Sequence, residues 1–380
     1  MITRQRIVSY GIPTVAVGTI VAAALLSPWN GGGAVVEEPS RPTPTTEDSA
    51  ARQIDVVFAV DTTASMGGLI EGAKRTVWSI ANHIKQSDQH ADVHVGLVAY
   101  RDIGDDYVTR DFPLSGDLDA MFVELSSYRA AGGGDIPEDV AAGMYDSIYK
   151  MKWRANATKM IFIVGDAAPA DRGDVPRFDV LAKTASDKQI IVNTIRCGED
   201  RDTAAAWQQI AMLGHGEFST IRQDGGVQDI ATPYDDKLAA LSSQIDHSSV
   251  ILGAAHRGHY AAKMAAAEAA PAAAKADRAG YYASMGSAAA RDDGDAVAKV
   301  AKGGTATVDT MNADDLPADL QGLSKDELKK ELSSRADKRK ELQNEIEELS
   351  KKRAEFLKTK AGKDGFDGKV KDTVDRELKR

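Results

Sequence analysis

The sequence predicts an α/β domain built on a doubly wound, mainly parallel β-sheet with helices on both faces. Between Ile54 and Thr220, short apolar runs alternate with stretches of helical periodicity, and this alternation is typical of strand–helix–strand units. The first run, from Ile54 to Val60, is apolar at every position except Asp55, as expected of a strand that is buried on both faces. We therefore assign the Rossmann-like domain to residues 52–222.

The expected elements of this domain follow one another in a regular order. Strands are expected at 54–60, 93–100, 107–112, 160–164, 189–195 and 216–220, the third of them at an edge of the sheet. Helices are expected at 68–85, 117–127, 137–151, 175–187 and 203–213. Because the carboxyl ends of parallel strands meet at one edge of such a sheet, a ligand site is expected there.

The composition excludes several classes of protein. The chain has 380 residues, a 43% hydrophobic share and a net charge of -10, which argues against binding nucleic acid through a basic face. Its one cysteine, Cys197, leaves no internal disulfide and no cysteine-based zinc cluster. The sequence contains neither a Gly-x-x-x-x-Gly-Lys-Ser/Thr phosphate loop nor a Gly-x-Ser-x-Gly nucleophile elbow, so ATP hydrolysis and serine-hydrolase chemistry are not expected.

The N-terminal region has the pattern of a membrane segment. Residues 7–29 carry no charge and follow Arg4 and Arg6, and about 20 such residues span a bilayer as a helix. The arginines favour a cytoplasmic N-terminus with the rest of the chain exported. We expect residues 1–30 to be an uncleaved anchor, and the alternative is a cleaved signal peptide that leaves a secreted or periplasmic protein. Residues 31–51, rich in Pro, Thr and Gly, are expected to form a flexible tether.

Three further segments are expected after the α/β domain. Residues 223–323 are rich in alanine and mostly helix-prone. We expect a charged amphipathic helix at residues 324–361 and a polar tail at residues 362–380. The charged helix carries apolar residues on a seven-residue pattern that arginines interrupt: Leu328, Leu332, Leu342, Ile346, Leu349 and Phe356, with Arg335, Arg339 and Arg353. This pattern suits both self-association as a coiled coil and packing of one helix stripe against a neighbour in the same chain.

A candidate metal-binding motif lies directly after the first strand. Asp61, Thr63 and Ser65 offer one carboxylate and two hydroxyls on alternate residues, so that the three oxygens project to the same side. A small hard cation such as Mg²⁺ prefers oxygen ligands of this kind. The structural alternative is that Thr63 or Ser65 caps the following helix and Asp61 accepts hydrogen bonds from backbone amides.

Two other loops extend this motif. Asp135 follows Gly132-Gly133-Gly134, just before a helix that begins with a proline, and Asp166 ends the apolar run at 160–164. Both are expected to reach the sheet edge that carries Asp61. Because several carboxylates repel one another unless a cation lies between them, the sequence predicts a metal site formed by Asp61, Thr63, Ser65, Asp135 and Asp166.

These motifs resemble the von Willebrand factor type A (VWA) family. Its metal-ion-dependent adhesion site uses Asp-x-Ser-x-Ser, a hydroxyl from a second loop and an aspartate from a third. Asp61-x-Thr63-x-Ser65 is similar to the first element, with threonine in place of one serine, and Asp166 to the third. Asp135 stands where threonine is usual, in a Gly-Gly-Gly-Asp-x-Pro-Glu loop that looks like a bacterial variant. The resemblance covers about residues 54–220.

The resemblance implies a binding module rather than an enzyme. Mg²⁺, or alternatively Mn²⁺ or Ca²⁺, would keep one coordination position for an Asp or Glu side chain of a partner protein. If Asp135 binds the ion directly, its charge weakens that attraction, whereas coordination through water leaves the site open. Two alternatives remain: a metal-assisted hydrolase with Glu138 as the base, and a scaffold protein that works through its helical C-terminal region.

Overall fold

The computed structural model describes residues 51–88, 91–134, 137–228, 230–286, 289–360 and 364–379. Residues 50–380 form one compact unit. The expected membrane segment at 1–30, and the expected tether apart from Ala51, lie outside the described residues. Within the described ranges, no helix combines the length and the apolar character that a membrane span requires.

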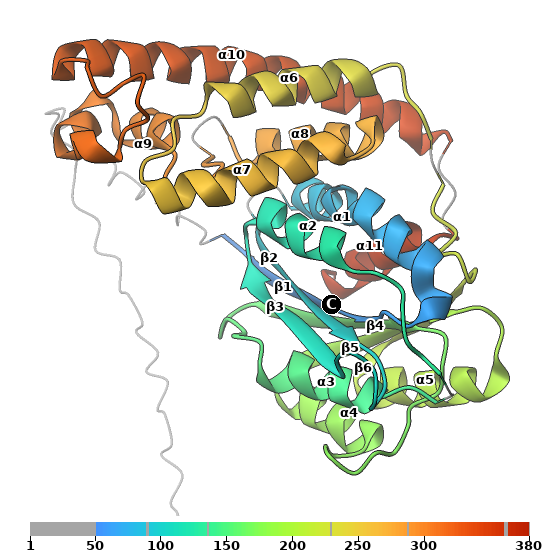
Figure 1. The fold of residues 1–380 in the computed structure, drawn as a ribbon. Coiled ribbons are helices and arrows are strands. Elements are labelled where there is room, and N and C mark those ends of the chain that lie inside the picture. Colours follow the sequence, from blue (N-terminus) through green and yellow to red (C-terminus); the bar gives the residue numbers. More distant parts are fainter. Residues whose placement is uncertain are drawn as a thin grey trace, which may run out of the picture. The chain divides into compact units, whose positions relative to one another are not determined.

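The unit is built around a six-stranded sheet with the order β3-β2-β1-β4-β5-β6 (Figure 1). Neighbouring strands are parallel except at the edge, where β3 runs antiparallel to β2. The strands are β1 (Gln53–Asp61), β2 (Asp92–Tyr100), β3 (Thr109–Ser115), β4 (Thr158–Gly165), β5 (Ile190–Cys197) and β6 (His215–Ile221). The predicted mainly parallel, helix-flanked sheet is confirmed, and so is the edge position of its third strand.

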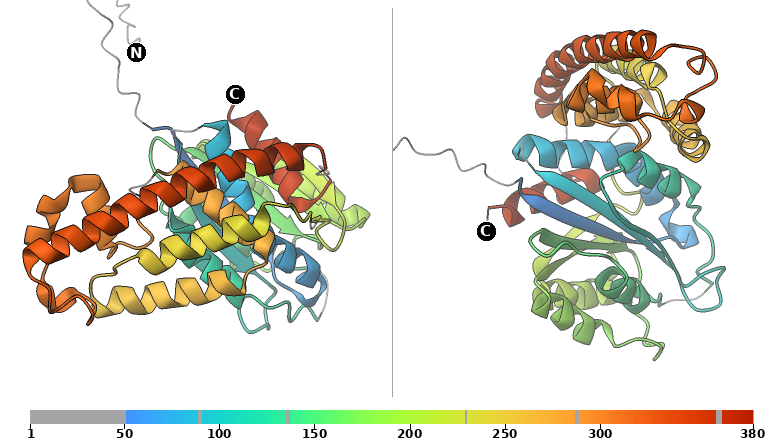
Figure 2. Two further views of the ribbon diagram at one scale, coloured as in Figure 1. Left: turned by 90° about the horizontal axis from the view of Figure 1, so that it is seen from above. Right: turned by 90° about the vertical axis from the view of Figure 1, so that its left-hand side faces the viewer.

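Alternate residues of β1 fill two separate hydrophobic cores. Val56 and Phe58 belong to the core under α1 and α2, whereas Val57 and Ala59 belong to the core under α3, α4 and α5. The helices are α1 (Gly67–Ser87), α2 (Leu118–Ser127), α3 (Val140–Tyr149), α4 (Phe178–Asp187) and α5 (Arg201–Leu213), and they lie on the two faces of the sheet (Figure 2). This arrangement explains the uninterrupted apolar run, because successive side chains of a strand point to opposite faces.

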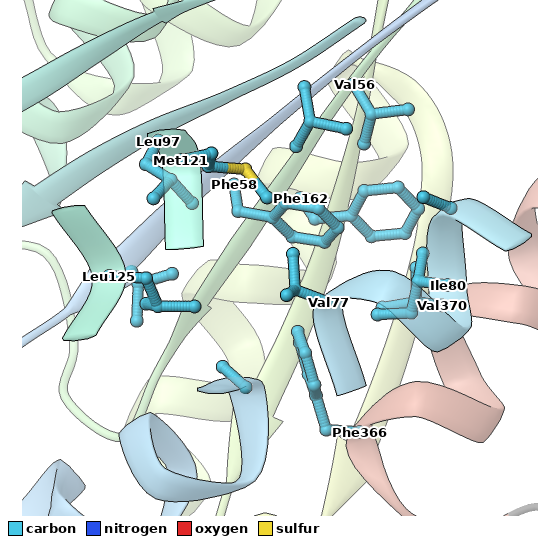
Figure 3. Close-up of a cluster of buried hydrophobic side chains, with 14 of the residues drawn as sticks. Val56, Phe58, Val77, Ile80, Leu97, Met121, Leu125, Phe162, Phe366 and Val370 are labelled. Carbon is cyan, nitrogen blue, oxygen red and sulfur yellow. The ribbon is translucent and has the colours of Figure 1, made fainter. Parts of the chain in front are cut away.

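The segment expected to be a polar tail contains a helix, α11 (Phe366–Glu377). This helix packs on α1 and β6, and its residues Phe366, Val370 and Val374 are buried in the same core as β1. The rings of Phe366 and Phe58 lie 6.0 Å apart between centroids (Figure 3). The expectation of a tail was wrong because the high polarity of the segment concealed three apolar residues at helical spacing, which is the signal of a helix that buries one face.

Truncating the buried face of α11 is expected to destabilise the domain measurably. Val370 is 0% exposed, and Val370→Ala should lower the free energy of unfolding by about 2 kcal/mol, because the change removes buried methyl groups and leaves a cavity. Val180 on α4 is 49% exposed, so Val180→Ala should stay within about 0.5 kcal/mol of the wild type. Urea unfolding compares the two variants, and equal losses would show that α11 contributes no core packing.

Among the described residues between β6 and α11 there are five helices: α6 (Asp235–Ser248), α7 (Ala254–Ala269), α8 (Ala272–Ser284), α9 (Ala296–Gly303) and α10 (Lys325–Lys358). Short 3-10 helices at Ala64–Met66, Thr305–Thr310 and Ala313–Asp315 complete the described elements. Helix α8 contacts α1, and α7 contacts α2. The helical region therefore lies against the helices on one face of the sheet (Figure 2).

The long charged helix α10 begins with a capping box at Ser324 and Glu327 and buries its stripe inside the chain. It contacts α6, α8 and α9, and Leu332 and Ile346 are fully buried. Two of the interrupting arginines form buried ion pairs. Arg339 donates to Asp295 over 2.8 Å, and Arg353 donates to Asp235 over 2.6 Å and to Asp277 over 2.7 Å. The structure thus favours intramolecular packing over a coiled-coil seam, because the chain itself covers this stripe.

Candidate metal centre

The first loop of the candidate centre brings its three oxygen groups together. Oδ1 of Asp61 accepts hydrogen bonds from the Thr63 amide over 2.8 Å and from the Thr63 hydroxyl over 2.7 Å. The Thr63 and Ser65 hydroxyls lie 3.3 Å apart. Asp61 and Thr63 are buried, whereas Ser65 is exposed. The alternating motif therefore aligns its oxygens as the sequence predicts, and the backbone bond to Asp61 expected from the structural alternative is present as well.

The second carboxylate oxygen of Asp61 is buried and has no hydrogen-bond partner among the described residues. The pKa of Asp61 is raised to about 7, chiefly by burial and in smaller part by the negative charge of Asp166, against the opposing hydrogen bonds from Thr63. An ionised carboxylate in such a place needs a partner that neutralises it. A divalent ion in contact with this oxygen would be such a partner, so the residues present fit a bound cation.

The third loop places Asp166 beside the first. Asp166 follows β4, its charge acts on Asp61, and its backbone oxygen accepts a 3.2 Å hydrogen bond from the Thr203 hydroxyl. A Cβ atom on the preceding Gly165 would lie 2.5 Å from the Tyr100 hydroxyl and 3.0 Å from Cβ of Asp61. The exit of β4, the end of β1 and the Tyr100 side chain are therefore in close contact, which agrees with the predicted convergence of the two loops.

The second loop lies against the first, although Asp135 itself falls outside the described residues. The Ala131 amide donates to the Thr62 carbonyl over 3.2 Å. Gly133 has a positive φ of 74°, and a Cβ atom there would lie 2.9 Å from Cβ of Thr63 and 3.1 Å from Oε1 of Glu138. Only glycine permits both this backbone conformation and this close approach.

Glu138 connects the second loop to the third. Its amide donates to the Ala168 carbonyl over 3.2 Å, and its carbonyl accepts from the Ala170 amide over 2.7 Å. The side chain is 3% exposed. Burial raises the pKa of Tyr100 well above its ordinary value, and the charges of Asp61, Asp166 and Glu138 raise it further. Three acidic side chains thus act on one buried hydroxyl.

Side chains from the loop after β2 form hydrogen bonds with the first and second loops. Arg101 is buried and donates to the Thr62 carbonyl over 3.2 Å and to the Arg129 carbonyl over 2.7 Å. Asp105 accepts a 3.1 Å hydrogen bond from the Gly133 amide. The first and second loops are consequently held by charged side chains whose roles are structural.

Metal binding at this edge of the sheet, where β1 and β4 end, would depend on hydroxyl groups. No three His, Cys, Asp or Glu side chains of the described ranges gather in a way that would hold a metal ion. The described members of the predicted site are two carboxylates, from Asp61 and Asp166, and two hydroxyls, from Thr63 and Ser65. Mg²⁺ accepts such a mixture and completes its octahedral shell with water.

Gln223 is a polar residue at this edge that the sequence reasoning did not select. Its amide nitrogen donates to Oδ2 of Asp166 over 2.5 Å and to the Ser65 carbonyl over 3.4 Å. The signal was available, since Gln223 comes just after the sixth strand and the carboxyl ends of the parallel strands share one edge.

The part of the chain that carries this candidate centre is similar to a known protein family. Residues 55–231 match the family described as von Willebrand factor A domain. This part of the chain is similar to VWA domains. The matched residues extend past the predicted boundary at 222 and include Gln223.

Three similar proteins illustrate the range of relatives. Alpha-protein kinase vwkA of Dictyostelium discoideum is 36% identical over 121 residues, which are 31% of this chain and 19% of that protein. The chain therefore spans about a fifth of the length of this curated relative. The crystal structure of BatB from Bacteroides thetaiotaomicron aligns with 44% of this chain and 90% of its own, at 16% identity and a TM-score of 0.36. The SpRpn10 VWA domain aligns with 47% of this chain and 91% of its own, at 15% identity and a TM-score of 0.36.

Proposed function

We propose that this protein is a metal-dependent protein-binding module. In this proposal a divalent ion, Mg²⁺ in the first instance, is held by Asp61, Thr63 and Ser65, with Asp135 and Asp166 bound directly or through water. The ion takes an Asp or Glu carboxylate of a partner protein in its remaining coordination position. The observation that carries the proposal is the buried Oδ2 of Asp61, which has no hydrogen-bond partner among the described residues. It belongs to the carboxylate whose Oδ1 accepts from the Thr63 hydroxyl, and that hydroxyl lies 3.3 Å from the Ser65 hydroxyl.

The acidic nature of the partner follows from the ligand set. Hydroxyl ligands carry no charge, so an ion held partly by Thr63 and Ser65 retains positive charge and attracts a carboxylate from outside. Asp135 decides how strong that attraction is, because a further direct carboxylate reduces the charge of the ion. The carboxylate of the buried Glu138 lies near the same edge of the sheet, and its negative charge would likewise weaken the attraction between the ion and the partner's carboxylate.

A binding role is favoured over a catalytic one. The hydrolase alternative requires Glu138 to accept a proton from a metal-bound water, and a side chain that is 3% exposed is poorly placed to serve a substrate that arrives from solvent. The kinase activity in the name of the Dictyostelium relative is not proposed for this chain, which spans 19% of that protein.

We also propose that the VWA domain is tethered to a membrane. The support is the uncharged stretch at residues 7–29 with arginines ahead of it and a Pro- and Thr-rich segment behind it, which would hold an exported domain away from the bilayer. Release after signal cleavage is the alternative outcome. Membrane fractionation of the expressed full chain, with N-terminal sequencing of the mature protein, distinguishes the two.

The binding proposal is tested by metal-dependent capture. The immobilised full chain should retain a partner protein in Mg²⁺ and release it in chelator, and the Asp61→Asn chain should retain none under either condition. Replacing the contacting Asp or Glu of the identified partner by Asn or Gln should abolish capture. Capture by the wild type that survives chelation, and persists in the Asp61→Asn chain, would exclude an ion-mediated contact.

Affinity for Mg²⁺ is expected to increase with pH up to about 7. The pKa of Asp61 in the metal-free protein is raised to about 7, so below that value a proton occupies the group that the ion requires. Each pH unit below 7 should then weaken binding by about tenfold, with little change above it. Isothermal titration calorimetry at pH 6, 7 and 8 measures this dependence, and equal affinities at pH 6 and 7 would argue against Asp61 as a ligand.

A further inference from the structure

We infer that Gln223 is a positioning residue of the metal centre, whose side-chain amide holds the Asp166 carboxylate in the orientation that the ion requires. This inference rests on the proposed function. It assigns to the loop after β6 a part in a site that sequence reasoning built from three other loops.

The contacts of Gln223 join two of those loops. Its amide nitrogen donates to Oδ2 of Asp166 over 2.5 Å, in the loop after β4. The same nitrogen lies 3.4 Å from the Ser65 carbonyl oxygen, in the loop after β1. Although Gln223 is exposed, one side-chain group thus connects a carboxylate of the site to the segment that carries its hydroxyls.

Contacts around the side-chain oxygen of Gln223 and within its own loop also hold this residue in position. Gly198, at the end of β5, has a positive φ of 74°, and a Cβ atom there would overlap Oε1 of Gln223. The Gly225 amide donates to the Arg222 carbonyl over 2.9 Å and closes a turn around Gln223. The Gly225 carbonyl in turn accepts a 2.8 Å hydrogen bond from the Phe366 amide, at the start of α11. The loop is therefore held by its own turn and by a buried helix.

A neutral amide suits this task chemically. When one carboxylate oxygen faces a metal ion, a donor on the other oxygen prevents rotation of the group and fixes the direction of its charge. A lysine or arginine at this position would also donate, but its positive charge would repel the ion and pair with the carboxylate instead. Glutamine donates without adding charge, which leaves Asp166 fully available to the cation.

The test is Mg²⁺ binding by the full chain carrying Gln223→Met, which keeps the length of the side chain and removes the donor. Isothermal titration calorimetry should show a ten- to hundredfold weaker affinity than the wild type, as is typical when an outer-shell partner of a metal ligand is lost. The melting temperature without metal should not change. The matched control is Gln208→Met on the exposed face of α5, which should bind Mg²⁺ like the wild type.

A second measurement separates positioning from a structural role. Tb³⁺ in place of Mg²⁺ reports the number of bound waters through its luminescence lifetime in H₂O and D₂O. If Asp166 binds the ion directly, its release should shorten the lifetime in H₂O, because water replaces the displaced oxygen, whereas a purely structural loss would not alter the hydration of the bound ion. If Gln223→Met melts at a lower temperature without metal, Gln223→Asn, which keeps an amide but is one carbon shorter, should give the same loss of affinity.

The outcomes are distinguishable. A wild-type chain that binds neither ion overturns the proposed function itself. A wild-type chain that binds both, together with Gln223→Met and Gln223→Asn chains of unchanged affinity and lifetime, overturns only the role of Gln223.

Discussion

Replacing Asp61 by asparagine is expected to abolish Mg²⁺ binding and to make the metal-free protein more stable at pH 8. Asparagine retains an Oδ1 that accepts the two hydrogen bonds from Thr63, but it removes the charge that burial disfavours. The affinity for Mg²⁺ should fall more than about a hundredfold, since a direct anionic ligand is lost. The free energy of unfolding without metal should rise by roughly 2–4 kcal/mol at pH 8.

The direction of the pH dependence follows from proton binding. The pKa of Asp61 in the folded chain is raised to about 7 from an ordinary value of 3.8, so between these values the folded chain holds a proton that the unfolded chain has lost. The contribution of Asp61 to stability therefore declines as the pH rises from about 4 to about 7, and it stays low above pH 7.

Urea unfolding at pH 4 and pH 8, with and without Mg²⁺, measures both effects in one experiment. Near pH 4 the wild type and the Asp61→Asn chain should be nearly equal in stability, which provides the internal control. At pH 8, Mg²⁺ should stabilise the wild type and leave the variant unchanged. A variant that is less stable than the wild type at pH 8, and that still responds to Mg²⁺, would contradict the assignment of Asp61 as a ligand.

Replacing Arg278 by alanine is expected to destabilise the protein by about 3–5 kcal/mol. Arg278, on α8, is 2% exposed and donates to Asp119 of α2 over 2.6 and 2.8 Å and to Asp246 of α6 over 2.6 Å. Burial opposes the ionisation of Asp119, but the charge and hydrogen bonds of Arg278 hold its pKa below the ordinary value. Removal of the arginine would leave two buried carboxylates without their common partner, and this accounts for the size of the effect.

The matched control for Arg278→Ala is Arg177→Ala, because the Arg177 side chain is 58% exposed and its pairs with Asp171 and Asp179 lie at the surface, where those side chains are 59% and 29% exposed. That variant should change the free energy of unfolding by less than about 0.5 kcal/mol. Urea unfolding should also show a single transition for the wild type, since Arg278 links the helical region to α2 of the α/β domain. A loss below about 1 kcal/mol in Arg278→Ala would show that the carboxylates find other partners or bind protons.

Local sequence determined the sheet and the edge of the sheet at which the candidate site lies. The continuous apolar runs of β1 and β4 specify strands that are covered on both faces, and a period of two assigns their residues to two cores without reference to the rest of the chain. Asp61 ends one of these strands and Asp166 directly follows the other, and the carboxyl ends of parallel strands lie at a common edge. The approach of these two residues was therefore predictable from periodicity and chain direction alone.

Only the tertiary structure decided which distant groups meet. Asp55, the one polar residue in the first apolar run, is fully buried and accepts hydrogen bonds from Arg154 over 2.7 and 2.8 Å. No local sequence pattern predicts that these two residues form a pair. The same holds for Arg339 with Asp295, for Gln223 with Asp166, and for α11 against α1 and β6. Periodicity reports which face of an element is buried, whereas the partner of a buried charge depends on how elements far apart in the chain pack together.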